Sequence, residues 1–311
     1  MADETRICVL PAAPHSAPAD RDRIEDAVRA GGGTLSGVAD ADGVIWTDWS
    51  DPAALGATLR EHPRVRWVQL VTSGVDAFGP LITDDRVWTS AKGAYAEPMA
   101  EWVLATLLAG FRGVPGYARD RRWEPQPTRS LFGARVTIVG GGGVTSALIR
   151  LLAPFEVTID VVRRAPVNVP GARRTVGPQL LEELAPQTDV LVLALALTPE
   201  TVGLVDARLL ERLPDDAWLV NVARGPLVVT DDLTVALETG RLGGAVLDVT
   251  EPEPLPAGHR LWRLANCLIT PHTSCPAELA APLLLRRIRD NVARRVAGLQ
   301  LDGVVDPVAG Y

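Results

Sequence analysis

Cysteine is scarce in this chain of 311 residues, and its distribution excludes two kinds of small fold. Cys8, Cys267 and Cys275 are odd in number, and no two of them form a C-x-x-C pair. A disulfide framework needs paired cysteines, and a zinc ribbon needs C-x-x-C pairs. We therefore expect free thiols and no metal site.

Long apolar runs and a leader sequence are also lacking. The longest apolar stretches, Trp102–Phe111 and Val190–Leu197, have about half the length that a membrane span requires. The first residues include Asp3 and Glu4 and no apolar segment of the kind found in secretory signals. We therefore expect a soluble, cytoplasmic protein that does not bind a membrane.

Lysine is almost absent, since Lys92 is the only one among 31 basic residues, a bias that we attribute to codon usage. The 38 acidic residues give a formal net charge of −7, whereas nucleic-acid-binding domains carry an excess of positive charge. No nucleic-acid partner is expected. The hydrolase pattern G-x-S-x-G and the metalloprotease pattern H-E-x-x-H are both missing.

What is present indicates two α/β domains. The length suits two domains, and short β-branched runs alternate with longer amphipathic segments, as in parallel α/β sheets. A helix is expected over Asp20–Ala30, because three glycines follow it. For the first domain we expect five strands, of which four are clear from the sequence: Arg6–Leu10, Val44–Trp46, Trp67–Val71 and Val87–Thr89.

A second strand–helix series follows. Two long helices, Glu97–Phe111 and Pro276–Gly298, are expected to cross between the domains as a hinge, and the Pro- and Gly-containing segment Arg112–Arg129 is predicted to be an irregular arm. Residues 1–98 with 280–311 are assigned to one domain and residues 99–279 to the other. The expected strands of the second domain are Arg135–Val139, Val157–Val162, Val190–Leu197, Trp218–Val222, Ala245–Val249 and Cys267–Thr270.

A glycine cluster lies between the first strand of this series and a helical pattern. That position makes it a candidate dinucleotide-binding turn, in which Gly140 forms the tight turn and Gly142 lets the backbone approach a pyrophosphate at the helix N-terminus. Gly143, Val144 and Thr145 complete the candidate cofactor contacts. Thr145 takes the place of the third glycine, so we expect the helix to lie slightly further from the strand. A glycine-rich turn without a ligand is the alternative.

Two arginines, Arg163 and Arg164, follow the next strand. An NAD site has an acidic residue at the end of this strand to bind the ribose 2′-hydroxyl. Asp160 lies 160 − 140 = 20 residues after Gly140, but two further strand-like valines follow it. We therefore place Arg163 at the strand end, where a guanidinium suits a 2′-phosphate, and predict NADP rather than NAD. A strand that ended earlier would favour NAD through Asp160, and a solvated loop is the remaining alternative.

Three residues that can bind a carboxylate and move a proton follow three successive strands. They are Arg224, Glu253 and His272, and ligands bind outside the carboxyl ends of strands in this fold class. The other histidines, His15, His62 and His259, are expected to be solvated. Purely structural roles are the alternative for any one of the three, but three such residues in order favour an active site.

These residues resemble the D-isomer-specific 2-hydroxyacid dehydrogenases over nearly the whole chain, from Ser73-Gly74-Val75-Asp76 to Val305-Asp306-Pro307. The segments Leu197-Thr198-Pro199-Glu200-Thr201 and Asn221–Gly225 match in order and spacing. The resemblance implies hydride transfer between NAD(P)H and a small 2-keto acid, with glyoxylate or hydroxypyruvate favoured. It also implies two parallel-sheet domains, Rossmann-like or flavodoxin-like, with the active site in the cleft between them.

The resemblance assigns roles to individual residues. Arg224 resembles the arginine that binds the substrate and polarises its carbonyl, His272 the general acid/base and Glu253 its carboxylate partner. Residues 1–98 with 280–311 would form the substrate domain and 99–279 the dinucleotide-binding domain, and the arm implies a homodimer. The remaining implied contacts are the backbone of Ser73 and Gly74 with the substrate carboxylate, and Val222, Ala223 and Asp248 with the cofactor.

Three positions depart from the family pattern: Thr145, Val229 in place of an acidic residue, and Glu156 in place of a glycine. None of them removes a catalytic group. The alternatives are a nucleotide-sensing, corepressor-like protein of the same fold, and a relative that acts on phosphoglycerate, formate or phosphite. A turnover assay with small keto acids separates these possibilities.

Overall fold

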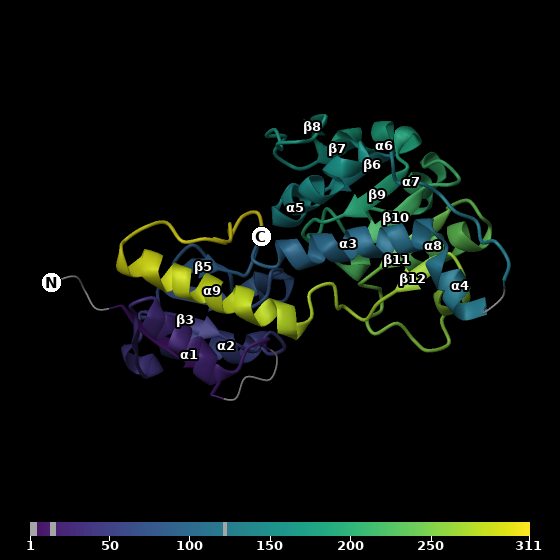
Figure 1. Ribbon diagram of the computed structural model, residues 1–311. Coiled ribbons are helices and arrows are strands. Elements are labelled where there is room, and N and C mark those ends of the chain that lie inside the picture. Colours follow the sequence, from purple (N-terminus) through teal and green to yellow (C-terminus); the bar gives the residue numbers. More distant parts are fainter. Residues whose placement is uncertain (1–4, 13–16, 121–122) are drawn as a thin grey trace. The chain divides into compact units, whose positions relative to one another are not determined.

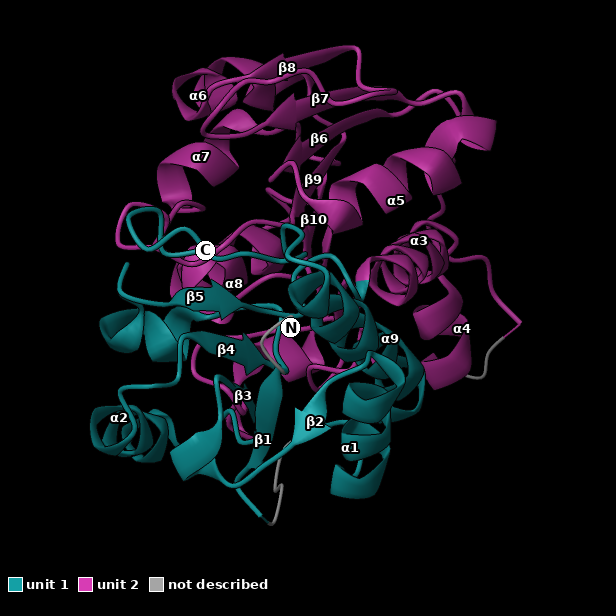
Figure 2. Ribbon diagram, turned by 90° about the vertical axis from the view of Figure 1, so that its left-hand side faces the viewer, with its two compact units in different colours: residues 1–95, 276–311 teal, residues 96–275 magenta. Residues whose placement is uncertain are grey.

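The computed structural model describes residues 5–12, 17–120 and 123–311, and the chain divides into two compact units (Figures 1 and 2). Unit 1 comprises residues 1–95 and 276–311, and unit 2 comprises residues 96–275. The chain enters unit 2 immediately before helix α3 (Ala96–Phe111) and leaves it immediately before helix α9 (Ala277–Val296). Each long helix therefore belongs to one unit, and the expectation that both cross between domains is wrong.

Unit 1 contains a parallel sheet of five strands in the order β2-β1-β3-β4-β5, as in flavodoxin-like folds. Alternate residues of the central strands face α2 (Pro52–Glu61) in an apolar core that includes Trp46 and Trp88. The opposite face carries Trp67, over which the Arg295 guanidinium of α9 lies, and α9 packs against α1 (Arg21–Ala30). The strands are β1 (Arg6–Leu10), β2 (Thr34–Leu35), β3 (Gly43–Trp46), β4 (Trp67–Leu70) and β5 (Val87–Thr89).

Unit 2 contains a parallel sheet of seven strands in the order β12-β11-β10-β9-β6-β7-β8. Counted from β6, this is the dinucleotide-binding order 3-2-1-4-5-6 with a seventh strand added. The strands are β6 (Arg135–Val139), β7 (Thr158–Val162), β8 (Arg174–Val176), β9 (Val190–Leu193), β10 (Trp218–Asn221), β11 (Gly244–Leu247) and β12 (Cys267–Ile269).

Helices cover both faces of this sheet, so most residues of its central strands are apolar. One face packs against α3 and α5 (Gly143–Leu152), and the other against α6 (Leu181–Leu184), α7 (Ala207–Arg212) and α8 (Thr230–Glu238). Short 3₁₀ helices occur at Val38–Asp40, Asp76–Leu81, Ala153–Phe155, Pro178–Leu180, Ala185–Gln187, Gly225–Leu227 and Arg260–Arg263. The prediction of two parallel-sheet α/β domains is confirmed.

Several local predictions need correction. The segment Arg112–Arg129 contains a helix, α4 (Val114–Asp120), because Pro115 is tolerated in a first helical turn; residues 121–122 of this segment lie outside the described part. Strand β9 ends at Leu193, four residues earlier than expected, and β8 was not expected. Within the described residues, no helix is both long and apolar enough to cross a membrane.

Candidate active site

The turn after β6 lies at the point where the strand order of unit 2 reverses. Strand β6 pairs with β7 on one side and β9 on the other, so the connections leave in opposite directions and create a crevice at the carboxyl ends. Gly140 adopts φ = 113°, and a Cβ atom there would lie 2.1 Å from the carbonyl oxygen of Ala194. Only glycine fits this position, which brings the backbone after β6 against the backbone after β9.

The N-terminus of α5 is open for an anion. Its N-cap residue, Gly142, makes no side-chain cap hydrogen bond, and a Cβ atom there would meet nothing within 4 Å. Thr145 is fully buried and its hydroxyl donates to the Gly140 carbonyl over 2.8 Å. Looser packing was expected at Thr145, but the structure shows that its side chain fastens the turn. These features fit the pyrophosphate of a dinucleotide.

Arg163 is the first residue after β7, and its side chain lies over the glycine turn. A Cβ atom at Gly141 would be 2.7 Å from the Arg163 Cδ and 3.0 Å from its Nε. The neighbouring Arg164 has an electrostatic interaction with Glu200, whose pKa is lowered first by a hydrogen bond from Thr198 and to a smaller extent by this positive charge. Both guanidiniums therefore belong to the edge where the ribose of a bound dinucleotide would lie.

Asp160 is engaged elsewhere. It is 6% exposed, and its carboxylate accepts hydrogen bonds from the Arg173 Nε and Nη2 over 2.9 and 2.5 Å. The Arg174 Nε lies 3.3 Å from the same group. Strand β7 continues to Val162, two residues further. The structure therefore does not support the alternative in which β7 ends at Asp160 and leaves its carboxylate for the ribose.

The turn that carries Arg224 is fastened by Asn221, at the end of β10. The Asn221 side chain accepts from the Ala223 N–H over 3.1 Å and donates to the Arg224 carbonyl over 2.8 Å. A Cβ atom at Gly225 would lie 1.9 Å from the Thr250 carbonyl oxygen, so this turn packs directly on the one after β11. Arg224 is partly exposed, and its Nη1 donates to the Ala223 carbonyl over 2.7 Å.

His272 and Glu253 form a pair at the ends of β12 and β11. The His272 Nδ1 lies 2.7 Å from the Glu253 Oε1, and the two side chains are 51% and 41% exposed. His272 adopts φ = 53°, a conformation that is rare for a residue with a side chain and that often marks functional sites. A carboxylate on Nδ1 fixes the orientation of the ring and directs Nε2 outward, which suits proton transfer.

Asp248 holds the segment that carries His272. Its side chain is buried, and its carboxylate accepts from the Thr270 hydroxyl and the N–H groups of Thr273 and Ser274 over 2.6, 2.7 and 2.9 Å. Its carbonyl accepts from the His272 N–H over 2.8 Å. The sequence suggested a contact between Asp248 and the nicotinamide, which stays a prediction. These hydrogen bonds between Asp248 and the segment that carries His272 could not be predicted from the sequence, because they depend on the path of the chain after β12.

Ser73 and Gly74, the predicted carboxylate-binding residues, lie in unit 1, in the loop after β4. The Ser73 hydroxyl donates to the Ala91 carbonyl over 3.2 Å, and the Ala91 N–H donates to the Thr72 carbonyl over 2.8 Å. Within the described residues, the N–H groups of Ser73 and Gly74 make no hydrogen bond. Two adjacent N–H groups in a fixed loop can bind a carboxylate. The predicted cleft between the domains stays a prediction, since each unit is described by itself.

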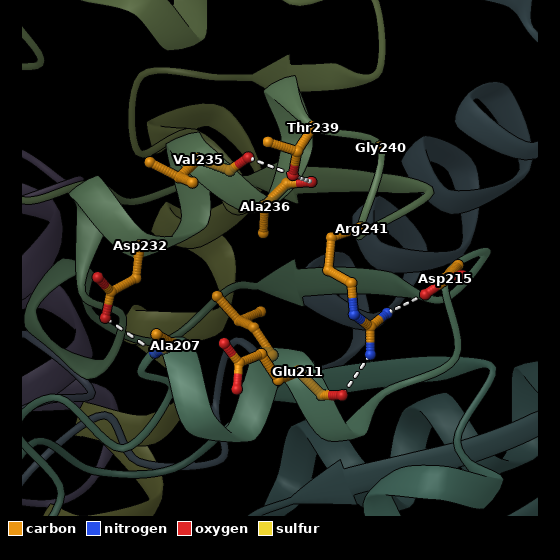
Figure 3. Close-up of a pocket in the computed structure, with 10 residues that line it drawn as sticks. Ala207, Glu211, Asp215, Asp232, Val235, Ala236, Thr239, Gly240 and Arg241 are labelled. Atoms are coloured by element: carbon orange, nitrogen blue, oxygen red, sulfur yellow. Dashed lines mark hydrogen bonds and ion pairs between the residues drawn. The ribbon is translucent and has the colours of Figure 1, made fainter.

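A separate pocket of about 430 Å³ lies between α7 and α8, and Figure 3 shows it. Its Arg241 donates to Asp215 and to the Glu211 carbonyl, so its charge is already neutralised. None of the candidate site residues lines it. In the described part of the chain, no group of three His, Cys, Asp or Glu side chains could hold a metal ion.

Comparison with known proteins identifies the family. The model of the D-isomer specific 2-hydroxyacid dehydrogenase NAD-binding domain matches residues 103–274. Glyoxylate/hydroxypyruvate reductase A of Escherichia fergusonii is 35% identical over 221 residues, 69% of either chain. The chain belongs to the D-isomer specific 2-hydroxyacid dehydrogenase family. The family match spans the turn after β6 together with Arg224, Glu253 and His272.

Solved structures agree with this family over the whole chain. A D-isomer specific 2-hydroxyacid dehydrogenase of Xanthobacter autotrophicus, in complex with NADPH, has a TM-score of 0.84 and 28% identity, and the match covers 99% of this chain and 100% of that one. The NADPH-dependent glyoxylate/hydroxypyruvate reductase of Sinorhizobium meliloti has a TM-score of 0.80 and 26% identity with the same coverage. The chain is an NAD(P)-dependent oxidoreductase of 2-keto and 2-hydroxy acids, as predicted, and the binding-protein alternative is not favoured.

Proposed function

We propose that this dehydrogenase reduces small 2-keto acids of the glyoxylate and hydroxypyruvate type and that it prefers NADPH. The pair formed by His272 and Glu253, in the unit that also carries Arg224 and an open dinucleotide turn, is the observation on which this proposal rests. The relatives from Escherichia fergusonii and Sinorhizobium meliloti carry glyoxylate/hydroxypyruvate reductase in their names.

The residues divide the reaction between binding and proton transfer. The turn Gly140–Thr145 and Arg163 would hold the dinucleotide, with Val222 and Ala223 beside it, and the bound nicotinamide supplies the hydride. The N–H groups of Ser73 and Gly74 would bind the substrate carboxylate. Arg224 would polarise the keto oxygen, since a guanidinium stabilises the negative charge that develops there.

His272 would donate the proton to that oxygen through Nε2. Glu253 on Nδ1 keeps the ring oriented. The four hydrogen bonds from the 270–274 segment to Asp248 hold the ring in place while the proton moves. In the oxidation direction the neutral ring accepts the proton from the 2-hydroxyl group.

Preference for NADPH follows from Arg163 and from the engagement of Asp160. A guanidinium over Gly141 can make charge-assisted hydrogen bonds to a 2′-phosphate, each contributing about 1.5–3 kcal/mol. No free carboxylate at the end of β7 competes for the ribose, because Asp160 is paired with Arg173. The neighbours solved with NADPH and NADP point the same way.

Assembly and cellular location are further parts of the proposal. The arm exposes apolar side chains, with Val114, Tyr117 and Trp123 at 51%, 42% and 104% exposure, which supports a symmetric homodimer through this segment. The thiols are unpaired, as expected in a reducing compartment, and we place the enzyme in the cytoplasm.

The test is NADPH oxidation with glyoxylate and hydroxypyruvate. We expect turnover in the parent, a kcat lower by about 10²–10⁴ in His272→Ala with NADPH affinity retained, and a kcat/KM at least about tenfold higher with NADPH than with NADH. Arg163→Ala should lose most of that preference, while Arg208→Ala, which removes an exposed arginine of α7 paired with Asp206, should keep it. Absence of turnover with both acids would contradict the reductase, and a parent that prefers NADH would contradict the role of Arg163.

A further inference from the structure

Five consecutive backbone carbonyls in the loop after β4 accept hydrogen bonds from groups of unit 1. They belong to residues 71–75, the loop that contains Ser73 and Gly74. In chain order the hydrogen bonds are Tyr95 Oη to Val71 over 2.7 Å, Ala91 N to Thr72 over 2.8 Å, Ser90 Oγ to Ser73 over 3.4 Å, Thr72 Oγ1 to Gly74 over 2.7 Å and Phe78 N to Val75 over 2.8 Å. Each peptide unit of the loop is therefore oriented through its carbonyl.

These bonds to the carbonyls also fix the direction of the N–H groups. A trans peptide unit is planar, so its C=O and the N–H of the next residue point in opposite directions. The bond from Ala91 to the Thr72 carbonyl therefore directs the Ser73 N–H away from Ala91. The bond from Ser90 to the Ser73 carbonyl does the same for the Gly74 N–H. Two neighbouring N–H groups are thus directed to one side of the loop, as a bound carboxylate requires.

Tyr95 supplies the shorter of the two side-chain hydrogen bonds that the segment 90–95 donates to this loop. Its side chain is 9% exposed, and the Val71 that accepts its bond is 3% exposed. A buried carbonyl that lost its donor would keep the desolvation penalty without the compensating bond, so the peptide unit after Val71 would rotate toward another donor. That unit directly precedes the one that carries the Ser73 N–H, and the rotation would turn this N–H away from the anion.

The segment 90–95 is itself held by the C-terminal part of unit 1. The Ser90 N–H donates to the Gly303 carbonyl over 2.9 Å, and the Arg287 Nη1 of α9 donates to the Ser90 carbonyl over 3.0 Å. A Cβ atom at Gly303 would lie 2.4 Å from the Ser90 carbonyl oxygen, so the two backbones are in direct contact. The Tyr95 hydroxyl is therefore a donor at a defined place in the fold.

We propose that Tyr95 is a positioning residue for the substrate carboxylate: its hydroxyl holds the Val71 carbonyl, so that the N–H groups of Ser73 and Gly74 keep the direction that an anion needs. Tyr95 acts through the loop and needs no contact with substrate or cofactor. This inference rests on the proposed function, because it needs the carboxylate on Ser73 and Gly74. Since every 2-keto acid has this carboxylate, the effect of Tyr95 is the same for all of them.

The experiment compares the parent with Tyr95→Phe in the reduction of glyoxylate and of hydroxypyruvate, with NADPH saturating. We expect the KM for both acids to rise about three- to tenfold, together with the Ki of oxamate, a competitive analogue with the same carboxylate, because one hydrogen bond typically contributes a change of this size. The kcat and the KM for NADPH should stay within about twofold, since His272, Glu253 and the dinucleotide turn belong to unit 2.

The control is Thr58→Val, which removes another hydroxyl of unit 1 that donates to a carbonyl, that of Ala54 in α2, over 2.9 Å. It should keep the parent's KM and Ki values. Thermal unfolding of both variants measures any general loss of stability. A Tyr95→Phe variant that unfolds at a lower temperature but keeps the parent's KM and Ki would show that the hydroxyl only stabilises the fold.

Two other results would also overturn the inference alone: a lower kcat in Tyr95→Phe with unchanged KM, and a change in KM for one of the two acids but not the other. A parent that reduces neither acid overturns the proposed function and the inference with it.

Discussion

At the scale of single residues, His272 shows how much of its chemistry depends on neighbours. The ring is half exposed and held at positive φ, and Glu253 and Asp248 fix its side chain and its backbone respectively. A histidine at the end of β12 without these two partners would have neither a defined orientation nor a preferred proton position. The proposed catalytic unit is therefore three residues from two adjacent strand ends.

The carboxylate of Glu253 should control how efficiently His272 transfers its proton. It lies 2.7 Å from Nδ1 and fixes the orientation of the ring, so that Nε2 can face the substrate oxygen. In Glu253→Gln an amide replaces this carboxylate, and kcat for glyoxylate reduction should fall, by less than the loss of about 10²–10⁴ expected on removing the general acid itself. Glu251→Gln, which changes a carboxylate two residues away, should keep the parent's kcat. Equal kcat values for Glu253→Gln and the parent would show that the pair does not position the ring.

At the scale of elements, the site is made by turns that pack on one another at the sheet edge. The turn after β10 has no room for a side chain at Gly225, where a Cβ atom would lie 1.9 Å from the Thr250 carbonyl. We predict that Gly225→Ala moves Arg224 and lowers kcat/KM for glyoxylate about 100-fold, since a displacement near 1 Å costs about that much.

The control for this element is Gly258→Ala, because a Cβ atom there meets nothing within 4 Å. It should leave kcat/KM unchanged. Circular dichroism and the affinity for NADPH should remain near the parent's values in both variants. A fully active Gly225→Ala would show that the two turns can separate without moving the arginine.

The strands of unit 2 show which elements could be predicted from the sequence and which could not. Long β-branched strands such as β6 and β7 were clear from composition, because they are buried on both faces. Strand β8 is three partly exposed residues at a sheet edge, too short and polar for a periodic signal. Arg224, Glu253 and His272 can be proposed as site residues from the sequence because they follow strands. The hydrogen bonds that Asp248 accepts depend on atoms brought together only by the fold.

At the scale of the whole molecule, the candidate site residues are divided between two units that each have their own core. The dinucleotide turn, Arg224 and His272 belong to unit 2, and Ser73 and Gly74 to unit 1. If one substrate molecule is bound by residues of both units, its binding should be detectable in each unit separately. The free N–H groups of Ser73 and Gly74 provide the probe, because an amide that forms a new hydrogen bond exchanges its hydrogen more slowly.

Hydrogen–deuterium exchange of the full-length protein tests this division. NADPH alone should protect peptides covering Gly140–Thr145 and Arg163 and leave those covering Ser73 and Gly74 unchanged. NADPH with oxamate, an unreactive analogue that keeps the carboxylate, should then slow exchange at Ser73 and Gly74 several-fold. Oxamide has the same shape but no carboxylate, and it should give no protection there, because the two N–H groups bind negative charge. Protection by oxamate in unit 2 without any at Ser73 and Gly74 would show that unit 1 does not bind the carboxylate, and Arg224 would then bind it alone.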